Sequence, residues 1–463
     1  MLDSTLPGGA ANTKRVRREY FSADGPFGTT DDVKAEFVEL WHADGGGKWV
    51  VQQASYLGYY PATGQVRFKF DQIQYDRMLE GLGIDKLNDA RTDQADVIAA
   101  YAAETLTYQA DGRVAEHAID GGQRTYAFTT EYSSATVAPN QWDVKTTETC
   151  TDALGRTLFT KTVYMNDRGD VLLTDLESDG GHWLEFKQYD DQYRLLLHVL
   201  PSALAGYSDL DGTLVPEYRE TPGLFRCYEY GESTTAGPET PGDVEGLLKR
   251  EWLKSRLFGG ERVAIRERGY FAYSAGGQDV FPIASIIDNP YSLDAAATSF
   301  TYTWHVGTVQ VKQRTTTLPL ISAAKNGSGV AATRVEELDA WGRPVWTKDE
   351  RGRVSHHVYD PLTGFQTRTI EDVNTASQAE LNPSAGFEGN ADGLHRVTDH
   401  QYDGAGRMVA TFGPEHTAVV DGQSVTVRQA TWTRYHEGAT WRETLAARGY
   451  QRVDDETEHV VGP

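Results

Sequence analysis

A short phrase recurs along this chain, and it constrains the fold more than any single residue does. The phrase reads Asp-x-x-Gly-Arg followed by a hydrophobic residue, and a tyrosine often leads it. Clear copies are Tyr108–Val114, Thr151–Leu158, Tyr164–Val171, Leu338–Val345, Asp349–Val354 and Tyr402–Met408, and looser copies are Tyr189–Leu195 and Tyr359–Phe365. An internal repeat is the signature of a fold that uses one small unit many times, so most of the chain is expected to be scaffold.

The spacing of the copies identifies the unit. The aspartates Asp339, Asp349 and Asp360 are 10 and 11 residues apart. A strand of about 5–6 residues with a short turn takes roughly 8–12 residues. One copy therefore predicts one strand with its turn, and two copies predict one β-hairpin.

The residue types of the phrase suit this interpretation. Aspartate can accept hydrogen bonds from backbone N–H groups across a turn, and glycine adopts the positive φ that a tight hairpin requires. Tyrosine, arginine and the closing aliphatic residue can pair with side chains of neighbouring strands. We assign such structural roles to Tyr108, Asp111, Gly112, Arg113, Asp152, Gly155, Arg156, Tyr164, Asp167, Gly169, Tyr189, Asp190, Asp339, Gly342, Arg343, Asp349, Gly352, Arg353, Tyr359, Asp360, Gly364, Tyr402, Asp403, Gly406 and Arg407.

These phrases resemble the repeats of the RHS-repeat, or YD-repeat, family of large secreted bacterial proteins. The resemblance lies in TDALGRTL, YMNDRGDVLLT, LDAWGRPVWTKDERGRVSHHVYDPLTG and YDGAGRM, and it covers about residues 105–200 and 300–440. In that family the repeats form a long β-sheet that winds into a hollow shell, which commonly encloses a C-terminal toxin or effector domain. The resemblance implies a non-enzymatic piece of such a shell, whose partner is the remainder of its own longer polypeptide.

The expected fold is mainly β, with repeated antiparallel hairpins in a long curved sheet that forms a partial shell. We divide the chain into an N-terminal α+β region, a first repeat block, a divergent β insert with loops and a second repeat block. Their bounds are residues 1–106, 107–200, 201–299 and 300–463. A fragment of this kind is expected to expose unpaired strand edges where the array ends.

The N-terminal region carries other signals. Residues 1–30 are rich in Gly, Thr and Arg and are expected to be loosely ordered. Strands are predicted at Ala35–Trp41, Lys48–Tyr60 and Gln65–Phe70, and two short helices at Asp71–Leu82 and Asp93–Leu106. In the insert, Leu247–Phe258 and Arg262–Ala272 are predicted to form a hairpin around Gly259-Gly260.

Composition narrows the classes of partner. The 463 residues carry 44 Lys and Arg against 67 Asp and Glu, which gives a net charge of −23 and a pI near 4.9. This charge disfavours binding to nucleic acid or to an anionic membrane. No apolar run reaches the ~18 residues that span a bilayer, and the first residues lack the features of a signal peptide. For a secreted or cell-surface protein, the export signal is therefore expected in sequence outside this chain.

One segment imitates a catalytic motif. Asp209-Leu210-Asp211-Gly212-Thr213 resembles the first motif of the haloacid-dehalogenase phosphatases, in which Asp209 would be the nucleophile and Asp211 the acid/base beside Mg²⁺. That chemistry requires a buried parallel strand directly upstream, and no βαβ pattern precedes the segment. We interpret it as a polar turn, with incidental Ca²⁺ binding as an alternative.

Other candidate sites are weaker. His356, His357, His395, His400 and His416 lie near one another in sequence, but their spacing does not converge on one point as a metal site requires. The two cysteines, Cys150 and Cys227, are interpreted as small hydrophobes, although a bridge between them is also possible in an exported protein. No cofactor or metal is expected.

Two further alternatives concern function. Tyr359–Gly364 is similar to the Asp-Pro-rich end of self-cleaving shells, but a later repeat at Tyr402 makes it an interior hairpin turn. The 24 Tyr and 10 Trp residues could bind surface glycans or partner cells from an exposed β face, as in an adhesion module. Packing of these rings between strands is the simpler prediction.

Overall fold

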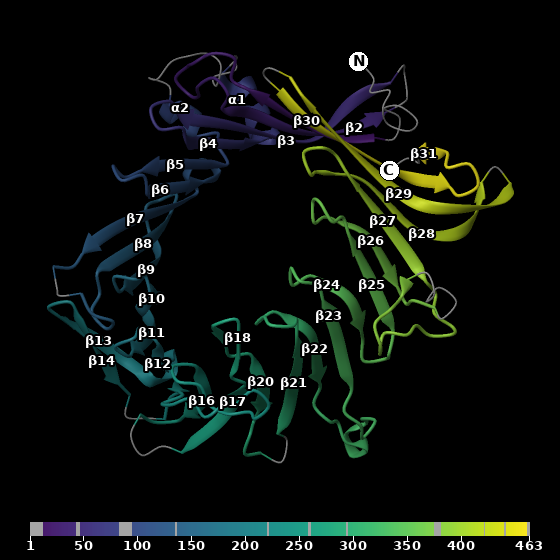
Figure 1. Cartoon of the computed structure of the whole chain (residues 1–463). Coiled ribbons are helices and arrows are strands. Elements are labelled where there is room, and N and C mark those ends of the chain that lie inside the picture. Colours follow the sequence, from purple (N-terminus) through teal and green to yellow (C-terminus); the bar gives the residue numbers. More distant parts are fainter. Residues whose placement is uncertain are drawn as a thin grey trace.

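The chain folds into one closed ring of antiparallel strands (Figure 1). The computed structural model describes residues 13–42, 47–82, 95–134, 137–219, 222–257, 261–292, 295–374, 381–420, 422–438 and 441–460. Within them, 27 strands belong to one sheet, and all four segments defined from the sequence contribute strands to it. Neither helix is long and apolar enough to cross a membrane.

The N-terminal region holds the first four strands and both helices. Their bounds are β1 (Thr13–Tyr20), β2 (Val33–His42), β3 (Lys48–Tyr60), β4 (Gln65–Asp71), α1 (Gln72–Leu82) and α2 (Ala95–Ala99). The three strands and the first helix predicted here are confirmed. The second helix ends earlier than predicted, because the chain turns after Ala99 and starts a strand at Glu104. Its predicted first residues, 93 and 94, lie outside the described part of the chain.

The expectation that residues 1–30 are loosely ordered is wrong for β1 (Thr13–Tyr20), and its first part, residues 1–12, lies outside the described residues. This strand has few apolar residues, but Arg15 and Arg17 direct their side chains to the carboxylate of Glu39 on β2. A pattern of apolar alternation cannot detect such a strand, since charged pairs replace its hydrophobic contacts.

Successive hairpins build the wall of the ring up to residue 200. The strands are β5 (Glu104–Tyr108), β6 (Val114–Ile119), β7 (Arg124–Tyr132), β8 (Val144–Asp152), β9 (Thr157–Met165), β10 (Val171–Ser178), β11 (Gly181–Tyr189) and β12 (Leu195–Val199). Each pairs antiparallel with the next, as the repeat spacing predicts.

The divergent segment continues the same wall and adds two small side hairpins. Its strands are β13 (Leu204–Leu210), β14 (Thr213–Tyr218), β15 (Phe225–Tyr230), β16 (Leu248–Lys254), β17 (Arg262–Tyr270), β18 (Tyr273–Ala275), β19 (Gln278–Val280) and β20 (Ile283–Asp288). The β13–β14 and β18–β19 hairpins form separate two-stranded sheets. The predicted pairing of β16 with β17 is confirmed, and its Gly259-Gly260 turn lies outside the described residues.

The last segment completes the circuit. Its strands are β21 (Ala296–Trp304), β22 (Val311–Thr317), β23 (Thr333–Leu338), β24 (Pro344–Lys348), β25 (Val354–Tyr359), β26 (Gln366–Glu371), β27 (Arg396–Tyr402), β28 (Met408–Val420), β29 (Gln423–Glu437), β30 (Trp441–Arg452) and β31 (Glu458–Val460). Tyr359–Gly364 connects β25 to β26, so the prediction of an interior hairpin turn is confirmed.

The ring closes between β30 and β1, which lie at opposite ends of the sequence. Their pairing runs antiparallel from Thr13 opposite Ala447 to Glu19 opposite Trp441. Since β31 pairs only with the far end of β30, 26 of the 27 strands form the closed circuit. The predicted open curved sheet is therefore wrong. The circuit itself has no cut edge, because its end strands pair with each other, whereas the short β31 pairs on one side only, in line with the predicted unpaired edge.

Four apolar clusters lie on one face of the wall, and each has its own cover. Both helices cover β2–β4, the β13–β14 hairpin covers β9–β12, and the loop that carries Phe387 covers β24–β26. The fourth cluster centres on Trp432 beneath Trp49 and Val460. Figure 1 shows the helices and the β13–β14 hairpin on the outside of the ring, so these clusters belong to its outer face.

Candidate functional site: the turn ladder and the inner wall

The turn at Asp339 shows what each residue of the repeat phrase does. The backbone N–H of Asp339 donates to the carbonyl of Arg343, and the N–H of Gly342 donates to the carbonyl of Asp339. The Asp339 carboxylate accepts the N–H groups of Trp341 and Arg343 through Oδ1, and the Arg343 Nε through Oδ2 at 2.8 Å. Gly342 has a φ of +79°. The aspartate thus caps the turn, and its arginine folds back onto it.

The same backbone frame recurs on other turns. Asp152, Asp190, Asp349 and Asp403 each accept two turn N–H groups through Oδ1. The arginines that follow three of them, Arg156, Arg194 and Arg407, also donate Nε to their own aspartate, at 2.6–2.8 Å. Tyr193, with a φ of 65°, takes the glycine position in the turn of Asp190.

In three copies the turn starts at a different residue, or has a different length, from the one predicted from the sequence. In Tyr164–Val171 the capping residue is Asn166, whose Oδ1 accepts the N–H groups of Arg168 and Asp170. Asp167 occupies the next position and accepts the Tyr193 hydroxyl instead. An amide oxygen caps a turn as well as a carboxylate does, so a pattern based on aspartate does not identify Asn166.

Of the other two copies, one has its turn at a different position and the other has a longer turn. In Tyr108–Val114 the turn starts at Gln109, and Asp111 contacts Arg113 from the third position. The turn of Asp360 is one residue longer, because the N–H of Asp360 donates to the carbonyl of Phe365.

Tyrosine hydroxyls link consecutive turns along one end of the ring, which we call the tyrosine rim. It consists of the turns that follow β3, β5, β7, β9, β11, β15, β17, β21, β23, β25, β27 and β29. Each of these tyrosines lies near the end of the strand that leads into one turn. Its hydroxyl donates to a backbone carbonyl near the start of the strand that follows the preceding turn, with an oxygen–oxygen distance of 2.7–3.3 Å. The pairs are Tyr108–Val66, Tyr189–Val171, Tyr230–Leu195, Tyr270–Leu248, Tyr302–Ile283, Tyr359–Pro344, Tyr402–Gln366 and Tyr435–Met408.

Arginine completes the link between neighbouring hairpins. The guanidinium carbon of Arg194 lies 4.6 Å from the ring centroid of Tyr230, that of Arg343 4.4 Å from Tyr359, and that of Arg407 4.2 Å from Tyr435. Each arginine is held by its own aspartate, so Asp, Arg and Tyr form a chain from one turn to the next. In the turn that lacks arginine, Phe365 stacks on Tyr402 at 4.8 Å.

We call this series of linked turns, with their capping residues, arginines and tyrosines, the turn ladder. Only part of it was predicted from the sequence. Tyr230, Tyr270, Tyr302 and Tyr435 join it although no Asp-x-x-Gly-Arg phrase follows them. The signal that could have found them is a tyrosine at the end of a strand, one hairpin after each turn. Conversely, Tyr164 lies in the outer cluster against Trp142 and Tyr207 and makes no rim bond of this kind.

Burial raises the pKa of several tyrosines of the rim. It raises the pKa of Tyr189 to about 12, and the pKa values of Tyr230, Tyr270, Tyr302 and Tyr359 are also raised because burial disfavours the phenolate. These hydroxyls therefore remain hydrogen-bond donors at more alkaline pH than a free phenol does.

The inner face of the wall carries ion pairs as well as apolar side chains such as Phe128 and Phe159. Antiparallel partners share a face and side chains alternate along a strand, so the neighbours of the outward Trp346, Ile370 and Phe412 point inward. Inward side chains form cross-strand ion pairs at 2.6–2.9 Å. They include Arg18–Glu36, Lys69–Glu104, Arg268–Glu251, Arg266–Asp288, Arg314–Glu336 and Arg396–Glu371. Paired threonines occur on both faces, as Thr369–Thr398 and Thr411–Thr431 inside and Thr149–Thr160 outside.

The number of strands makes the ring too wide to fill with its own side chains. Twenty-six strands at about 4.8 Å each give a circumference on the order of 125 Å and a diameter of roughly 40 Å. Closed sheets of 16–18 strands already leave an aqueous channel. A ring of this width, lined in part by cross-strand ion pairs, can enclose water or another polypeptide.

The phosphatase-like segment is a hairpin turn. Asp211 and Gly212, with φ of 51° and 87°, form the two-residue turn between β13 and β14. Asp209 accepts the Gly212 N–H at 3.1 Å and the indole N–H of Trp142 at 2.9 Å. Because Asp209 lies in an antiparallel hairpin, it lacks the parallel-strand setting that a phosphatase nucleophile requires.

The histidines do not form a metal site. His356 stacks on Trp346 at 4.0 Å, and burial lowers the pKa values of His356 and His357. His400 contacts Thr411, and His416 contacts the carbonyl of Pro414. Within the described ranges, no three His, Cys, Asp or Glu side chains converge where a metal ion could bind.

The cysteines lie on different faces of the wall. Cys150 is buried on the inner face opposite Tyr126, whereas Cys227 is half-buried in the outer cluster. Both are free thiols, and their placement on opposite faces does not allow a bridge between them.

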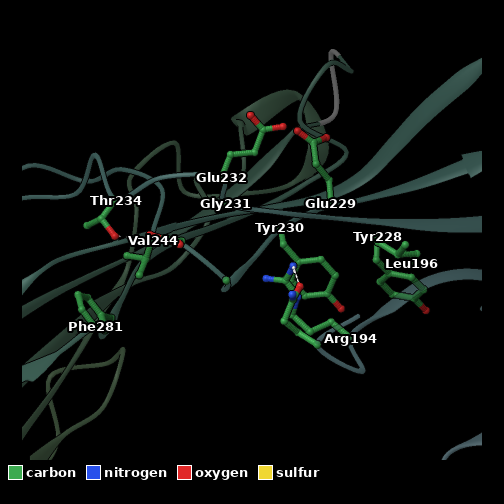
Figure 2. A pocket seen from close by; sticks show the side chains of 13 residues that line it. Arg194, Leu196, Tyr228, Glu229, Tyr230, Gly231, Glu232, Thr234, Val244 and Phe281 are labelled. Atoms are coloured by element: carbon green, nitrogen blue, oxygen red, sulfur yellow. Dashed lines mark hydrogen bonds between the residues drawn. The ribbon is translucent and has the colours of Figure 1, made fainter. Parts of the chain in front are cut away.

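A hollow of about 950 Å³ opens on the tyrosine rim beside the turn of Asp190. Figure 2 shows Arg194 against Tyr230, with Glu229 and Glu232 beyond them. Arg194 already bonds Asp190 and Gln192, so its charge is neutralised within the wall. The hollow is a depression between adjacent repeats.

Comparisons with known proteins give only remote likenesses. No protein-family profile matches the chain, and no curated protein matches it. The crystal structure of TcdB2-TccC3 aligns with 93% of this chain and 26% of its own at 11% identity and a TM-score of 0.25. The Photorhabdus luminescens Tc holotoxin pore aligns with 100% of this chain and 27% of its own at 12% identity and a TM-score of 0.25.

A porin-like protein from Bacteroides uniformis aligns with 71% of this chain at 9% identity and a TM-score of 0.18. At these TM-scores the likenesses do not establish a shared fold. The chain spans about a quarter of the length of the two toxin proteins.

Proposed function

We propose that this chain is a non-enzymatic wall segment of an exported bacterial RHS-repeat protein, and that its ring encloses or presents an effector polypeptide of the same larger protein. The repeat phrases resemble that family, and the turn ladder gives them a purely structural use. The observation that carries the proposal is the placement of the four buried apolar clusters outside the ring, with cross-strand ion pairs along its inner face.

Two matched cysteine probes test the hollow interior. Thr398 lies on the inner face and Thr315 on the outer face, both in mid-strand and both half-buried. In a Cys150→Ala, Cys227→Ala background, Thr398→Cys and Thr315→Cys are expected to react with a small maleimide at similar rates. An inner thiol that reacts a hundredfold more slowly would mean that the interior is packed, and the proposal would fail.

A fused tail tests enclosure. An unstructured tail with a protease site, attached after Pro463, is expected to be cleaved more slowly than the free peptide and to shield the thiol of Thr398→Cys. The thiol of Thr315→Cys is the control and should keep its rate. Cleavage at the rate of the free peptide, with no shielding of the inner thiol, would contradict enclosure.

A further inference from the structure

Three successive turns of the tyrosine rim each carry a fully exposed apolar side chain. Val306 lies in the turn between β21 and β22, Trp341 in the turn between β23 and β24, and Leu362 in the turn between β25 and β26. Their exposed fractions are 101%, 81% and 93%. These side chains project from the end of the wall and contribute nothing to its core.

The row continues on both sides, and we call it the apolar arc. Phe281, before β20, is 39% exposed, and Met408, at the start of β28, is 41% exposed. Successive turns of one rim are two strands apart, or about 10 Å, so the arc extends over roughly 40 Å. Elsewhere on this rim Val137, in the turn after β7, is 63% exposed, whereas the turns 109–113, 166–170 and 190–194 read QADGR, NDRGD and DDQYR and have polar tips.

The turns themselves do not require apolar tips. The backbone N–H groups of Trp341 and Leu362 bond their capping aspartates, and polar residues such as Gln192 and Arg351 occupy the same position in other turns. Exposed apolar side chains that gather in one place mark a contact surface. The arc therefore points to a partner.

We propose that the partner is a second copy of this chain, docked rim to rim about a two-fold axis through the β23–β24 turn. The order of side chains along the arc is symmetric about Trp341. A two-fold axis there places Trp341 against its own copy, Val306 against Leu362, and Phe281 against Met408. A central tryptophan with smaller apolar flanks is the usual arrangement of an energetic centre in an interface.

Charge and size favour a protein partner over a lipid surface. The chain as a whole has a net charge of −23, so an anionic bilayer would repel it. Asp339 is neutralised by Arg343 and Asp403 by Arg407, which lets two such rims approach. With side chains of about 150–250 Å² each, the arc offers on the order of 600 Å², close to the ~800 Å² per partner of a standard interface.

The test uses the whole chain and a control at the equivalent position of another turn. Leu154 occupies the position of Trp341 in the turn of Asp152, is 78% exposed, and lies on the opposite rim. By sedimentation velocity, the wild-type chain is expected to form a dimer whose dissociation constant rises at least about tenfold in Trp341→Ser and stays unchanged in Leu154→Ser. A wild-type monomer at 100 µM (roughly the weak end of specific association), or equal effects of both variants, overturns the proposal.

Disulfide trapping tests the axis itself in the Cys150→Ala, Cys227→Ala background. Trp341→Cys alone should form a covalent dimer, and a mixture of Val306→Cys with Leu362→Cys should form mixed dimers. Val306→Cys alone should not, and efficient trapping of it would contradict the axis. Co-sedimentation with phosphatidylcholine vesicles in place of self-association would identify a lipid surface as the occupant and also overturn the proposal. The inference is independent of enclosure, since a dimer can form whether or not the ring holds a polypeptide.

Discussion

The guanidinium of Arg343 lies over the ring of Tyr359, with 4.4 Å between the guanidinium carbon and the ring centroid. The two residues belong to neighbouring hairpins of the tyrosine rim. Asp339 holds the arginine, and the Tyr359 hydroxyl donates to the carbonyl of Pro344 at 3.0 Å, directly after that arginine. The repeat phrase therefore stabilises the contact between hairpins as well as the turn within each one.

Removal of one ladder hydroxyl should cost about as much as one hydrogen bond. Tyr359→Phe keeps the ring over Arg343 and removes only the bond to Pro344, so a loss of about 1 kcal/mol in the free energy of unfolding is expected from urea titration. Tyr291→Phe is the control, because this ring is exposed and its hydroxyl contact with Glu267 is 3.3 Å long. It should change stability by less than about 0.5 kcal/mol. Equal losses in both variants would show that the ladder bond is not special.

The glycine of the turn should be required for its conformation alone. Gly342 has a φ of +79°, and a Cβ there would meet no atom within 4 Å. Gly342→Ala is therefore expected to cost about 1–2 kcal/mol, the penalty of a left-handed conformation. Gly404, in the turn of Asp403, also has open space around it but no positive φ, so Gly404→Ala should be neutral or slightly stabilising. A loss at Gly404 as large as at Gly342 would point to an effect other than φ.

The capping aspartates predict loss of stability in acid. The side-chain and backbone bonds of Arg156 hold the pKa of Asp152 below its ordinary value, and the backbone bond of Arg407 does the same for Asp403. Since the unfolded state binds protons first, this stabilisation is complete above about pH 5 and is lost as the pH falls through the lowered pKa values. The urea midpoint should therefore be flat with respect to these groups from pH 7 to 5 and fall below about pH 4. Asp403→Asn should fall less steeply than the wild-type chain in acid, and an unchanged slope would contradict this origin.

The hairpins could be predicted from the sequence because each is decided locally. A capping residue, a glycine with positive φ and a closing aliphatic residue lie within one turn, so the spacing of Asp339, Asp349 and Asp360 gave the strand length correctly. The first residue of the turn was predicted wrongly at Asn166 and Gln109, because side chains other than aspartate can start the same turn. Tyr193 shows the same tolerance at the glycine position, where its ring stacks on Arg168 at 3.6 Å.

Closure of the ring could not be predicted in the same way. It depends on the pairing of β1 with β30, about 430 residues apart in the chain, and no local pattern encodes such a pairing. The strand that makes it, Thr13–Tyr20, is rich in arginine and reads as a polar tail. The inner and outer faces of the wall were also hidden, because their assignment depends on which clusters the helices and side hairpins cover.

The last prediction concerns β1, the strand that closes the ring. Glu39 on β2 is 4% exposed, and its carboxylate accepts Arg15 Nε at 2.6 Å and Arg17 Nε at 3.3 Å. Arg15 also reaches Glu443 on β30 at 3.4 Å, so this network joins the three strands at the seam. Glu39→Gln removes one of two carboxylate partners from each guanidinium, since Arg15 keeps Glu443 and Arg17 keeps Glu19. The loss of these charged hydrogen bonds should cost about 2 kcal/mol.

Hydrogen exchange can localise that loss. In Glu39→Gln the amides of β1 and of the paired half of β30 are expected to exchange faster, while those of β8 and β9 on the other side of the ring keep their rates. Glu36→Gln is the matched control, because Glu36 pairs with Arg18 on the inner face of the same strands and both side chains are exposed. Such a pair contributes less than about 1 kcal/mol. If exchange accelerates uniformly around the ring, the seam opens only with global unfolding. If β1 and β30 alone accelerate, the ring has one place at which it can open without losing its hairpins.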